Sequence, residues 1–478
     1  MKLQYNPDSK DSIISFAKQL IGKAVLVEYA EEIPLLNLKG TDKGRLGKVI
    51  EELYFRYKPN SNKSADFKQA GLELKASGLK ELAKNKGFNA KERLVLNIIN
   101  YEDAIIQDFD NDFLTGKNAH LLLVFYLYEK GVDILASIIK LVGDWQYSEE
   151  DIEIIRQDYN FIKNKILSGK AHELSEGDTY YLGACTKGGK GGNFRHQPKS
   201  NIKAKQRAYS LKPGYLNHII ASIANNQHIK YGKLIPSVEV AKKQSIEDVV
   251  ISKFKPYYGK SINQILQLTG VEINIKSKNF YASLTKAILG IELDKEIEEF
   301  EKAEIVVKSI RIESNNSIEQ SVSFPAFEFE KINSENWITS EFKELIERKF
   351  LFIFFKNDGK EYFLEKIKFW NMPFEDRNEV RKVWLKTKYI IQNGNIFNDF
   401  DKDKLGNNRY SIKGNPVRLN NFPKSSESRV SHVRPHGKDS THTFPLPVKD
   451  QKLNVNEYSK QCFWLNNTYV RDEIYLKP

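Results

Sequence analysis

The sequence predicts a mixed α/β protein that contains two tandem copies of one fold, each with a mixed central sheet flanked by helices. Apolar runs of strand length, residues 92–101 and 120–129, alternate with longer segments of helical periodicity, residues 45–57 and 149–169. Five segments of the first half also recur, in the same order, in the second half. The alternative is a pair of unrelated α/β domains with generic patterning.

The recurring segments predict where the two copies begin and end. The pairs are LIGKAV (20–25) with YYGKSI (257–262), LGKVIEEL (46–53) with LTKAILGI (284–291), GLELKAS (71–77) with EIVVKSI (304–310), LLLVFYLYEKG (121–131) with LFIFFKNDGK (351–360), and QRAYSLKPGYL (206–216) with KQCFWLNNTYV (460–470). Periodicity is lost over 225–244, where polar residues accumulate. We therefore expect a first domain over 1–224, a linker over 225–244 and a second domain over 245–478.

Composition narrows the class of protein. Hydrophobic residues make up 40% of the 478 residues, which is enough for sizeable cores. The net charge of +12 is consistent with a polyanionic partner, although many basic proteins bind nothing acidic. Two distant cysteines, Cys185 and Cys462, exclude a disulfide framework and a cysteine zinc site. No apolar run approaches the length of a membrane span, so we expect a cytoplasmic protein without membrane contact.

Asp66, Glu73 and Lys75 form a D-x6-E-x-K pattern whose last two residues share one face of a predicted strand. Two converging carboxylates suit Mg²⁺, and a nearby lysine can position water and stabilise charge on a phosphate. These are the groups that metal-dependent phosphodiester hydrolysis requires. The pattern alone is weak, because acid-x-Lys recurs elsewhere in the chain and a solvated strand face with an ion pair would look the same.

Two further features strengthen the nuclease interpretation. Glu51, on the preceding amphipathic helix, can supply a third carboxylate, with Glu52 as its rival and an exposed helical charge as the alternative for either. Between Thr186 and Lys212 the chain carries eight Lys or Arg residues and no acid. We expect three of these cations to face DNA phosphates or base edges, unless this stretch is simply a solvated loop. They are Lys187, Lys190 and Arg195.

Longer segments resemble a known family. ADFKQAGLELKASG, KERLVLNIINYE, GKAHELSEGDTYYL, IKAKQRAYSLKPGY and HVRPH are similar to the GATC-cleaving type II restriction endonucleases of the Sau type, which are relatives of the MutH mismatch-repair nickase. The resemblance covers nearly the whole chain and both copies. It implies a MutH-like fold in each copy and a magnesium-dependent endonuclease of the PD-(D/E)xK class, which cuts double-stranded DNA 5′ to the G of GATC in the bacterial cytoplasm.

The resemblance also assigns roles to individual residues. It implies that Asp66, Glu73 and Glu51 bind the metal ion and that Lys75 is the catalytic lysine. Lys187 and Lys212 match basic residues near the DNA. The base-reading loop departs from MutH, because Cys185-Thr186-Lys187 stands where MutH has Arg-Pro-Lys. Lys117 is a candidate for a further lysine that MutH contributes from its third strand.

The second copy lacks two of the carboxylates. The repeat places Val306 against Glu73 and Leu289 against Glu51, while Lys308 stands against Lys75. Apolar side chains cannot coordinate Mg²⁺, so we expect this copy to be catalytically dead. Its HVRPH segment falls at the base-reading loop, and we expect Arg434 and His436 to contact DNA. A zinc site at His432 and His436 is disfavoured, because no carboxylate or thiolate clusters with them.

The leading hypothesis is a type II restriction endonuclease whose second copy binds another GATC site as an effector or acts as a pseudo-dimer partner. We expect a monomer or a DNA-induced dimer, one or two DNA sites per protein, and a cognate DNA methyltransferase in the same system. The alternatives are a MutH-type nickase, which needs one copy of the fold, and a non-enzymatic DNA-binding regulator. Nucleotide-binding folds are disfavoured, since neither GxGxxG after a strand nor a GK[ST] loop occurs.

Overall fold

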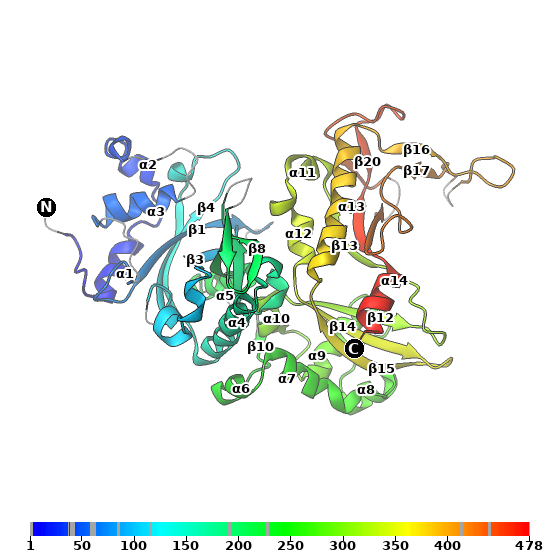
Figure 1. Cartoon of the computed structure of the whole chain (residues 1–478), viewed down its shortest axis with the longest axis horizontal. Coiled ribbons are helices and arrows are strands. Elements are labelled where there is room, and N and C mark those ends of the chain that lie inside the picture. The colour runs from blue at the N-terminus through cyan, green and yellow to red at the C-terminus, as the bar shows by residue number, and fades with distance from the viewer. Residues whose placement is uncertain are drawn as a thin grey trace. The chain divides into compact units, whose positions relative to one another are not determined.

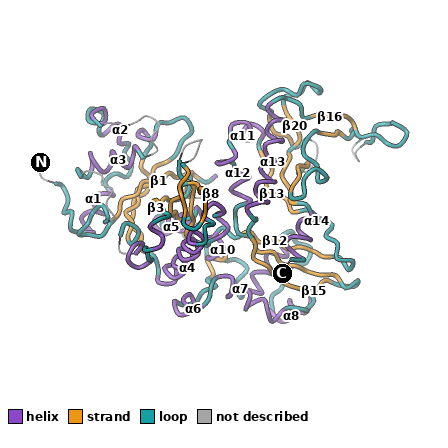
Figure 2. The backbone as a smooth tube through the Cα atoms, viewed as in Figure 1, coloured by secondary structure: helices purple, strands orange, loops and turns teal. Residues whose placement is uncertain are grey.

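A computed structural model describes residues 3–36, 38, 44–57, 64–83, 87–114, 116–188, 193–225, 229–410, 414–437 and 441–477. The chain forms two compact units, one of residues 1–256 with 273–305 and the other of residues 257–272 with 306–478. Both units combine strands and helices, as Figures 1 and 2 show, which confirms the predicted mixed α/β class. Among the described residues, no helix is both long and apolar enough to cross a membrane.

The boundary between the units differs from the predicted one. Helix α6 (Val238–Lys243), inside the expected linker, packs on helix α4 (Glu149–Leu167), and Gln157 of α4 donates a hydrogen bond to the Ala241 carbonyl at 2.7 Å. Residues 273–305 also pack with the first unit. The described residues of 225–244 therefore belong to the first unit, and Leu234 and Ile235 among them are each 2% exposed.

The first unit contains two main sheets. One has the strand order β2-β1-β4-β5, in which β1 and β4 are parallel and the outer pairs are antiparallel; the other is antiparallel, with the order β3-β9-β6. The strands of this unit are β1 (Glu73–Glu81), β2 (Phe88–Ala90), β3 (Leu94–Ile98), β4 (His120–Leu127), β5 (Ile139–Gln146), β6 (Leu182–Thr186), β7 (Phe194–Gln197), β8 (Ser200–Lys205), β9 (Arg207–Leu211), β10 (Tyr231–Gly232) and β11 (Glu296–Ile297).

Helices cover this framework. Besides α4 and α6 they are α1 (Lys10–Lys18), α2 (Val25–Glu28), α3 (Arg45–Val49), α5 (Pro213–Ile223), α7 (Ile246–Phe254), α9 (Phe280–Leu289) and α10 (Glu298–Ala303). Strand β4 is almost entirely apolar and buried along nearly its whole length, as expected for a central strand. Helix α4 begins where the Ser148 side chain accepts a hydrogen bond from the Asp151 backbone N–H.

The second unit repeats the topology of the first. Strands β12, β14 and β15 form a sheet in which β12 and β14 are parallel and β15 is antiparallel, and β13-β21-β18 is antiparallel throughout. Its elements are α8 (Ile262–Thr269), β12 (Val306–Ile312), β13 (Val322–Phe327), α11 (Phe329–Ser334), α12 (Glu341–Ile346), β14 (Phe350–Asn357), β15 (Tyr362–Trp370), α13 (Phe374–Gln392), β16 (Phe397–Phe400), β17 (Arg418–Asn420), β18 (Ser431–Pro435), β19 (Thr443–Pro445), β20 (Glu457–Ser459), β21 (Gln461–Leu465) and α14 (Asn467–Tyr469).

Details of hydrogen bonding match between the units. The Gly22–Lys23 pair exchanges backbone hydrogen bonds of 2.8 and 2.9 Å with Ile139 on β5, and the Gly259–Lys260 pair exchanges bonds of the same lengths with Leu364 on β15. Both glycines have positive φ, 86° and 75°, where a side chain would be strained. The β4–β5 and β14–β15 pairs are also interrupted at equivalent registers. The echo of LIGKAV in YYGKSI therefore reflects a repeated structural element.

Candidate active site

The first carboxylates are brought together by a tight turn before β1. Phe67 and Leu72 exchange backbone hydrogen bonds of 2.9 and 3.3 Å, and Gly71 between them has φ of 66°. This turn places Asp66 beside the start of β1: its Oδ2 accepts from the Leu74 backbone N–H at 3.1 Å, and its own N–H donates to Glu73 Oε2 at 3.2 Å. The six-residue spacing between the two acids is thus the length of a closed hairpin.

Two lysines neutralise Glu73. The Glu73 residue is 2% exposed, Lys75 Nζ lies 2.7 Å from its Oε1, and Lys117 Nζ lies 3.7 Å from the same atom. Burial raises the pKa of the Glu73 carboxyl, and the positive charge of Lys75 opposes that rise. The structure thus brings Glu73 and Lys75 together and places Lys117, from the turn before β4, beside them.

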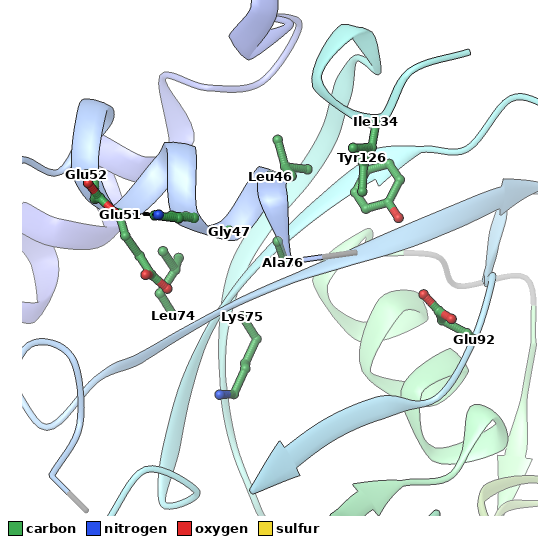
Figure 3. A pocket seen from close by; sticks show the side chains of 12 residues that line it. Leu46, Gly47, Glu51, Glu52, Leu74, Lys75, Ala76, Glu92, Tyr126 and Ile134 are labelled. Atoms are coloured by element: carbon green, nitrogen blue, oxygen red, sulfur yellow. Dashed lines mark ion pairs between the residues drawn. The ribbon is translucent and has the colours of Figure 1, made fainter. Parts of the chain in front are cut away.

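Glu51 faces this pair from the helical side. It lies in a π-helical turn, Ile50–Tyr54, that continues α3. Glu51 and Lys75 both line a cavity of about 620 Å³, which Figure 3 shows. Burial raises the pKa of Glu51 to about 7, and the negative charges of Asp66 and Glu73 add to that rise. Glu52 lines the same cavity but forms an ion pair with Lys48 of α3 at 3.7 Å. The carboxylate of this helical segment that Asp66 and Glu73 repel is therefore that of Glu51.

Tyr57 is a residue of this cluster that sequence reasoning missed. Its hydroxyl is buried and has no hydrogen-bond partner among the residues that the structure describes, and its ring packs on Phe67 with 5.3 Å between centroids. Burial raises the Tyr57 pKa, and the charges of Asp66, Glu51 and Glu73 raise it further, so the phenol stays protonated. A tyrosine soon after an acidic helix carries no pattern that indicates such convergence; the contact depends on the turn that ends the helix.

The donor set suits a hard divalent cation. Within the described parts of the chain, no three His, Cys, Asp or Glu side chains lie close enough together to hold a metal ion between them. Asp66 and Glu73 nevertheless supply two adjacent carboxylates, which is the usual protein share of a Mg²⁺ site that keeps several waters. Burial raises the pKa of both Glu51 and Glu73, and neighbouring carboxylates add to the rise, so a cation bound here would favour their ionised forms.

The structure describes Lys187 and Arg195, two of the cations of the first unit that we expect to face DNA. Lys187 follows β6, and its backbone N–H donates to the Gln206 carbonyl at 2.7 Å. Arg195 lies on the β7–β8 hairpin, exposed, with its guanidinium 3.1 Å from Gln206 Oε1. Lys190 lies outside the described residues.

Lys212 is a correction to the sequence interpretation. It is 2% exposed, and its ammonium donates to the Thr179 carbonyl. Its position immediately before α5 buries the side chain among the backbone groups that precede β6, near the Asp158 carboxylate. Lys212 therefore supports the β6 strand from within and has no exposed ammonium to offer to DNA.

The equivalent loop of the second unit exposes both residues expected there. Arg434 and His436 are exposed at the end of β18, and the His436 backbone N–H donates to the Lys460 carbonyl at 3.0 Å, as Lys187 does to Gln206. The Arg434 guanidinium lies 3.7 Å from the centre of the Trp464 ring, a cation–π contact. His432 is buried, and its Nδ1 is 2.5 Å from Asn466 Oδ1.

The second unit lacks the acidic cluster around its strand lysine. Val306 begins β12, where Glu73 begins β1, and Lys308 is in register with Phe352 as Lys75 is with Leu123. Leu289 is buried at the end of α9, in the segment that packs with the first unit, so of the two apolar replacements only Val306 shares a unit with Lys308.

Comparison with known proteins shows which family of proteins this chain resembles. Residues 55–158, which hold Asp66, Glu73, Lys75 and Lys117, match the family model of the DNA mismatch repair enzyme MutH. The chain is 36% identical, over 98% of its own length and 98% of the relative's, to the type II restriction enzyme Sau3AI of Staphylococcus aureus. The chain belongs to the Sau-type, MutH-like restriction endonucleases. Members of this family are site-specific deoxyribonucleases, and DNA is therefore the partner of the enzyme.

Proposed function

We propose that this endonuclease recognises double-stranded GATC and hydrolyses the phosphodiester 5′ to the G, in the bacterial cytoplasm and alongside a cognate DNA methyltransferase. The observation that carries the cutting step is the juxtaposition of Asp66, Glu73 and Lys75 in one closed hairpin. The full-length similarity to a type II restriction enzyme supports the choice of double-strand cleavage over nicking.

The proposed roles follow from the contacts. Asp66 and Glu73, with Glu51 on the opposite wall, would hold Mg²⁺, which when bound lowers the pKa of water and neutralises phosphate charge. Lys75 is held by Glu73 at 2.7 Å and would position the attacking water beside the scissile phosphate. Lys117 would share the charge on Glu73 and keep the lysine pair near the phosphate.

The DNA would follow the basic side of the first unit. The β7–β8 hairpin exposes Arg195, His196, Lys199 and Lys203 and contains no acidic residue. Cations on such a hairpin can contact phosphates, and Lys187 at the end of β6 would reach base edges. In the second unit, Arg434 and His436 occupy the equivalent loop and would contact DNA there without cutting it, either at another GATC site or as a pseudo-dimer partner.

Digestion of a GATC plasmid without accessory proteins tests the function. We expect Mg²⁺-dependent linear fragments and no cleavage in EDTA. Because each chain is expected to have one cutting site, the two strands must be cut by two successive nicks, which pass through an open circle, or by transient pairing of two proteins. Open circles that never become linear would indicate a MutH-type nickase, and an intact plasmid with retained binding would indicate a DNA-binding regulator. Adenine-methylated and unmethylated plasmids with one or two sites then define methylation sensitivity and site number.

A further inference from the structure

Lys308 is a partly buried cation that the proposed cutting reaction does not use. It occupies the place of Lys75 in the repeated fold: both are the third residue of a strand that runs parallel to the central strand of its sheet. In the first unit this lysine is paired with Glu73 at 2.7 Å. In the second unit the residue at the position of Glu73 is Val306, so the lysine has lost its carboxylate.

No acidic group replaces that partner. Among the residues that the structure describes, no carboxylate forms an ion pair with Lys308, and its ammonium donates a long hydrogen bond to the Ser323 carbonyl at 3.4 Å. Burial lowers the Lys308 pKa, and no neighbouring charge is a cause. A partly buried ammonium without a paired anion is costly, because it has given up part of its hydration without an equivalent interaction.

A cavity of about 180 Å³ opens beside this ammonium. Besides Lys308 and Arg311, its wall includes three serines, Ser309, Ser321 and Ser323. Two glutamates also belong to the wall. Glu313 accepts hydrogen bonds from Tyr362 and Asn357, at 2.7 and 3.3 Å, and Glu319 is exposed. The cavity therefore combines a partly buried cation, an exposed second cation and serine hydroxyls, which are groups that bind a phosphate, with two glutamates, of which Glu313 is already hydrogen-bonded.

We infer that this cavity binds a phosphodiester of the DNA backbone directly, through Lys308, without a bridging metal ion. The inference rests on the proposed DNA-binding role of the second unit. In the first unit, Glu73 pairs with the lysine and would repel a phosphate unless a cation intervened. In the second, Val306 leaves the lysine charge without an ion pair among the described residues, and Glu313 of the cavity wall is held by Tyr362 and Asn357 instead. The duplication would thus have turned one cutting site into a metal-independent phosphate site.

Binding of a GATC duplex of about 20 base pairs in EDTA tests this, with Glu73→Gln as the background so that no cutting occurs. In EDTA no metal ion can bridge a carboxylate and a phosphate, so the share of the affinity that the second unit contributes should depend on Lys308. Lys308→Met should weaken binding about tenfold and reduce the slope of log affinity against log salt by about one. Lys360→Met, in the exposed turn between β14 and β15, is the matched control and should change affinity less than about twofold.

A second pair of variants keeps the lysine. Val306→Glu should weaken binding as much as Lys308→Met, because the new carboxylate would pair with Lys308 as Glu73 pairs with Lys75. Val306→Gln should retain binding. If Lys308→Met does not fold, as judged by circular dichroism, the two Val306 variants test the inference on their own. Unchanged affinity and salt slope in Val306→Glu would overturn the inference.

A measurement with inorganic phosphate distinguishes a site for a DNA phosphodiester from a site for free phosphate. If Lys308→Met abolishes thermal stabilisation by inorganic phosphate but leaves duplex binding intact, the site takes free phosphate and the phosphodiester assignment is overturned. Plasmid cleavage by the wild-type chain is measured alongside. Failure of that cleavage rejects the proposed function, whereas intact cleavage with unchanged binding in the Lys308 variants rejects this inference alone.

Discussion

Asp66 and Glu73 are adjacent at the candidate active site and Glu51 faces them from the helical side, so the repulsion among these carboxylates can be measured. Glu51 is ionised with difficulty, since burial and the charges of Asp66 and Glu73 raise its pKa from 4.5 to about 7. Lys75 and Lys117 offset part of this charge. The cluster therefore stores destabilising energy that a bound cation would release, a common feature of sites built for catalysis.

Glu51→Gln should have opposite effects with and without metal. A carboxyl whose folded-state pKa is raised contributes stability that is present below pH 4.5 and lost as the pH rises through about 7. At pH 8 in EDTA the variant should be more stable than wild type by ~2 kcal/mol, and at pH 4.5 the difference should vanish. In Ca²⁺ at pH 8 it should gain less stability than wild type does.

Thermal unfolding of both proteins at the two pH values, with EDTA or Ca²⁺, measures these differences. Glu52→Gln is the control, because Glu52 pairs with Lys48 and should show neither the pH-dependent gain nor the loss of metal stabilisation. Equal stability of Glu51→Gln and wild type at both pH values would show that Glu51 is not part of a repulsive cluster.

At the scale of elements, each long helix is fixed by one buried aspartate in its first turn. Asp151 of α4 accepts a hydrogen bond from the Tyr215 hydroxyl at 2.7 Å, and Asp376 of α13 accepts one from the Tyr469 hydroxyl at 2.6 Å. Both aspartates are 4% exposed. Each also pairs with a cation, Lys302 in the first unit and Arg429 in the second. The repeat therefore extends to the interactions that position these helices.

Tyr215→Phe and Tyr469→Phe should each destabilise their own unit by ~2 kcal/mol. A hydrogen bond to a buried carboxylate is lost in both cases, and the cation that remains satisfies the aspartate only in part. Tyr389→Phe, on the exposed face of α13, should change stability by less than about 0.5 kcal/mol. Urea unfolding, monitored by amide hydrogen exchange in each unit, measures the loss of unfolding free energy. An effect no larger than that of Tyr389→Phe would contradict the proposed anchoring.

The strands and the repeat could be predicted from sequence because apolar periodicity encodes them locally. The strand 120–129 and the helix 149–169 correspond to β4 and α4, and the Gly22 and Gly259 segments make the same bonds. Side-chain placement could not be predicted in the same way. Lys212 is buried because α5 begins beside it, and the polar segment 225–244 belongs to a unit because α6 packs on α4. Such outcomes depend on tertiary contacts that no local pattern contains.

For the molecule as a whole, duplication would explain the proposed division of roles, in which the first unit cuts DNA and the second holds it. The two units share their strand topology, the tyrosine–aspartate hydrogen bonds at the starts of α4 and α13, and the backbone hydrogen bonds that Lys187 and His436 donate. They differ where chemistry requires carboxylates, at Glu73 and Val306. Within the described residues, one acidic pair of this kind lies beside a strand lysine, at the start of β1, so we expect every DNA strand that one chain cuts to pass through that site.

Single-turnover cleavage of a supercoiled GATC plasmid by Glu73→Gln is the most direct test of that claim. The rate of the first nick should fall by at least about 10³-fold, with neither open circles nor linear DNA formed, while duplex binding in Ca²⁺ is retained. Glu81→Gln, at the exposed end of the same strand, should cut as wild type does. Open circles formed by Glu73→Gln at a rate within tenfold of wild type would contradict the account, since cutting would then come from outside the Glu73 cluster.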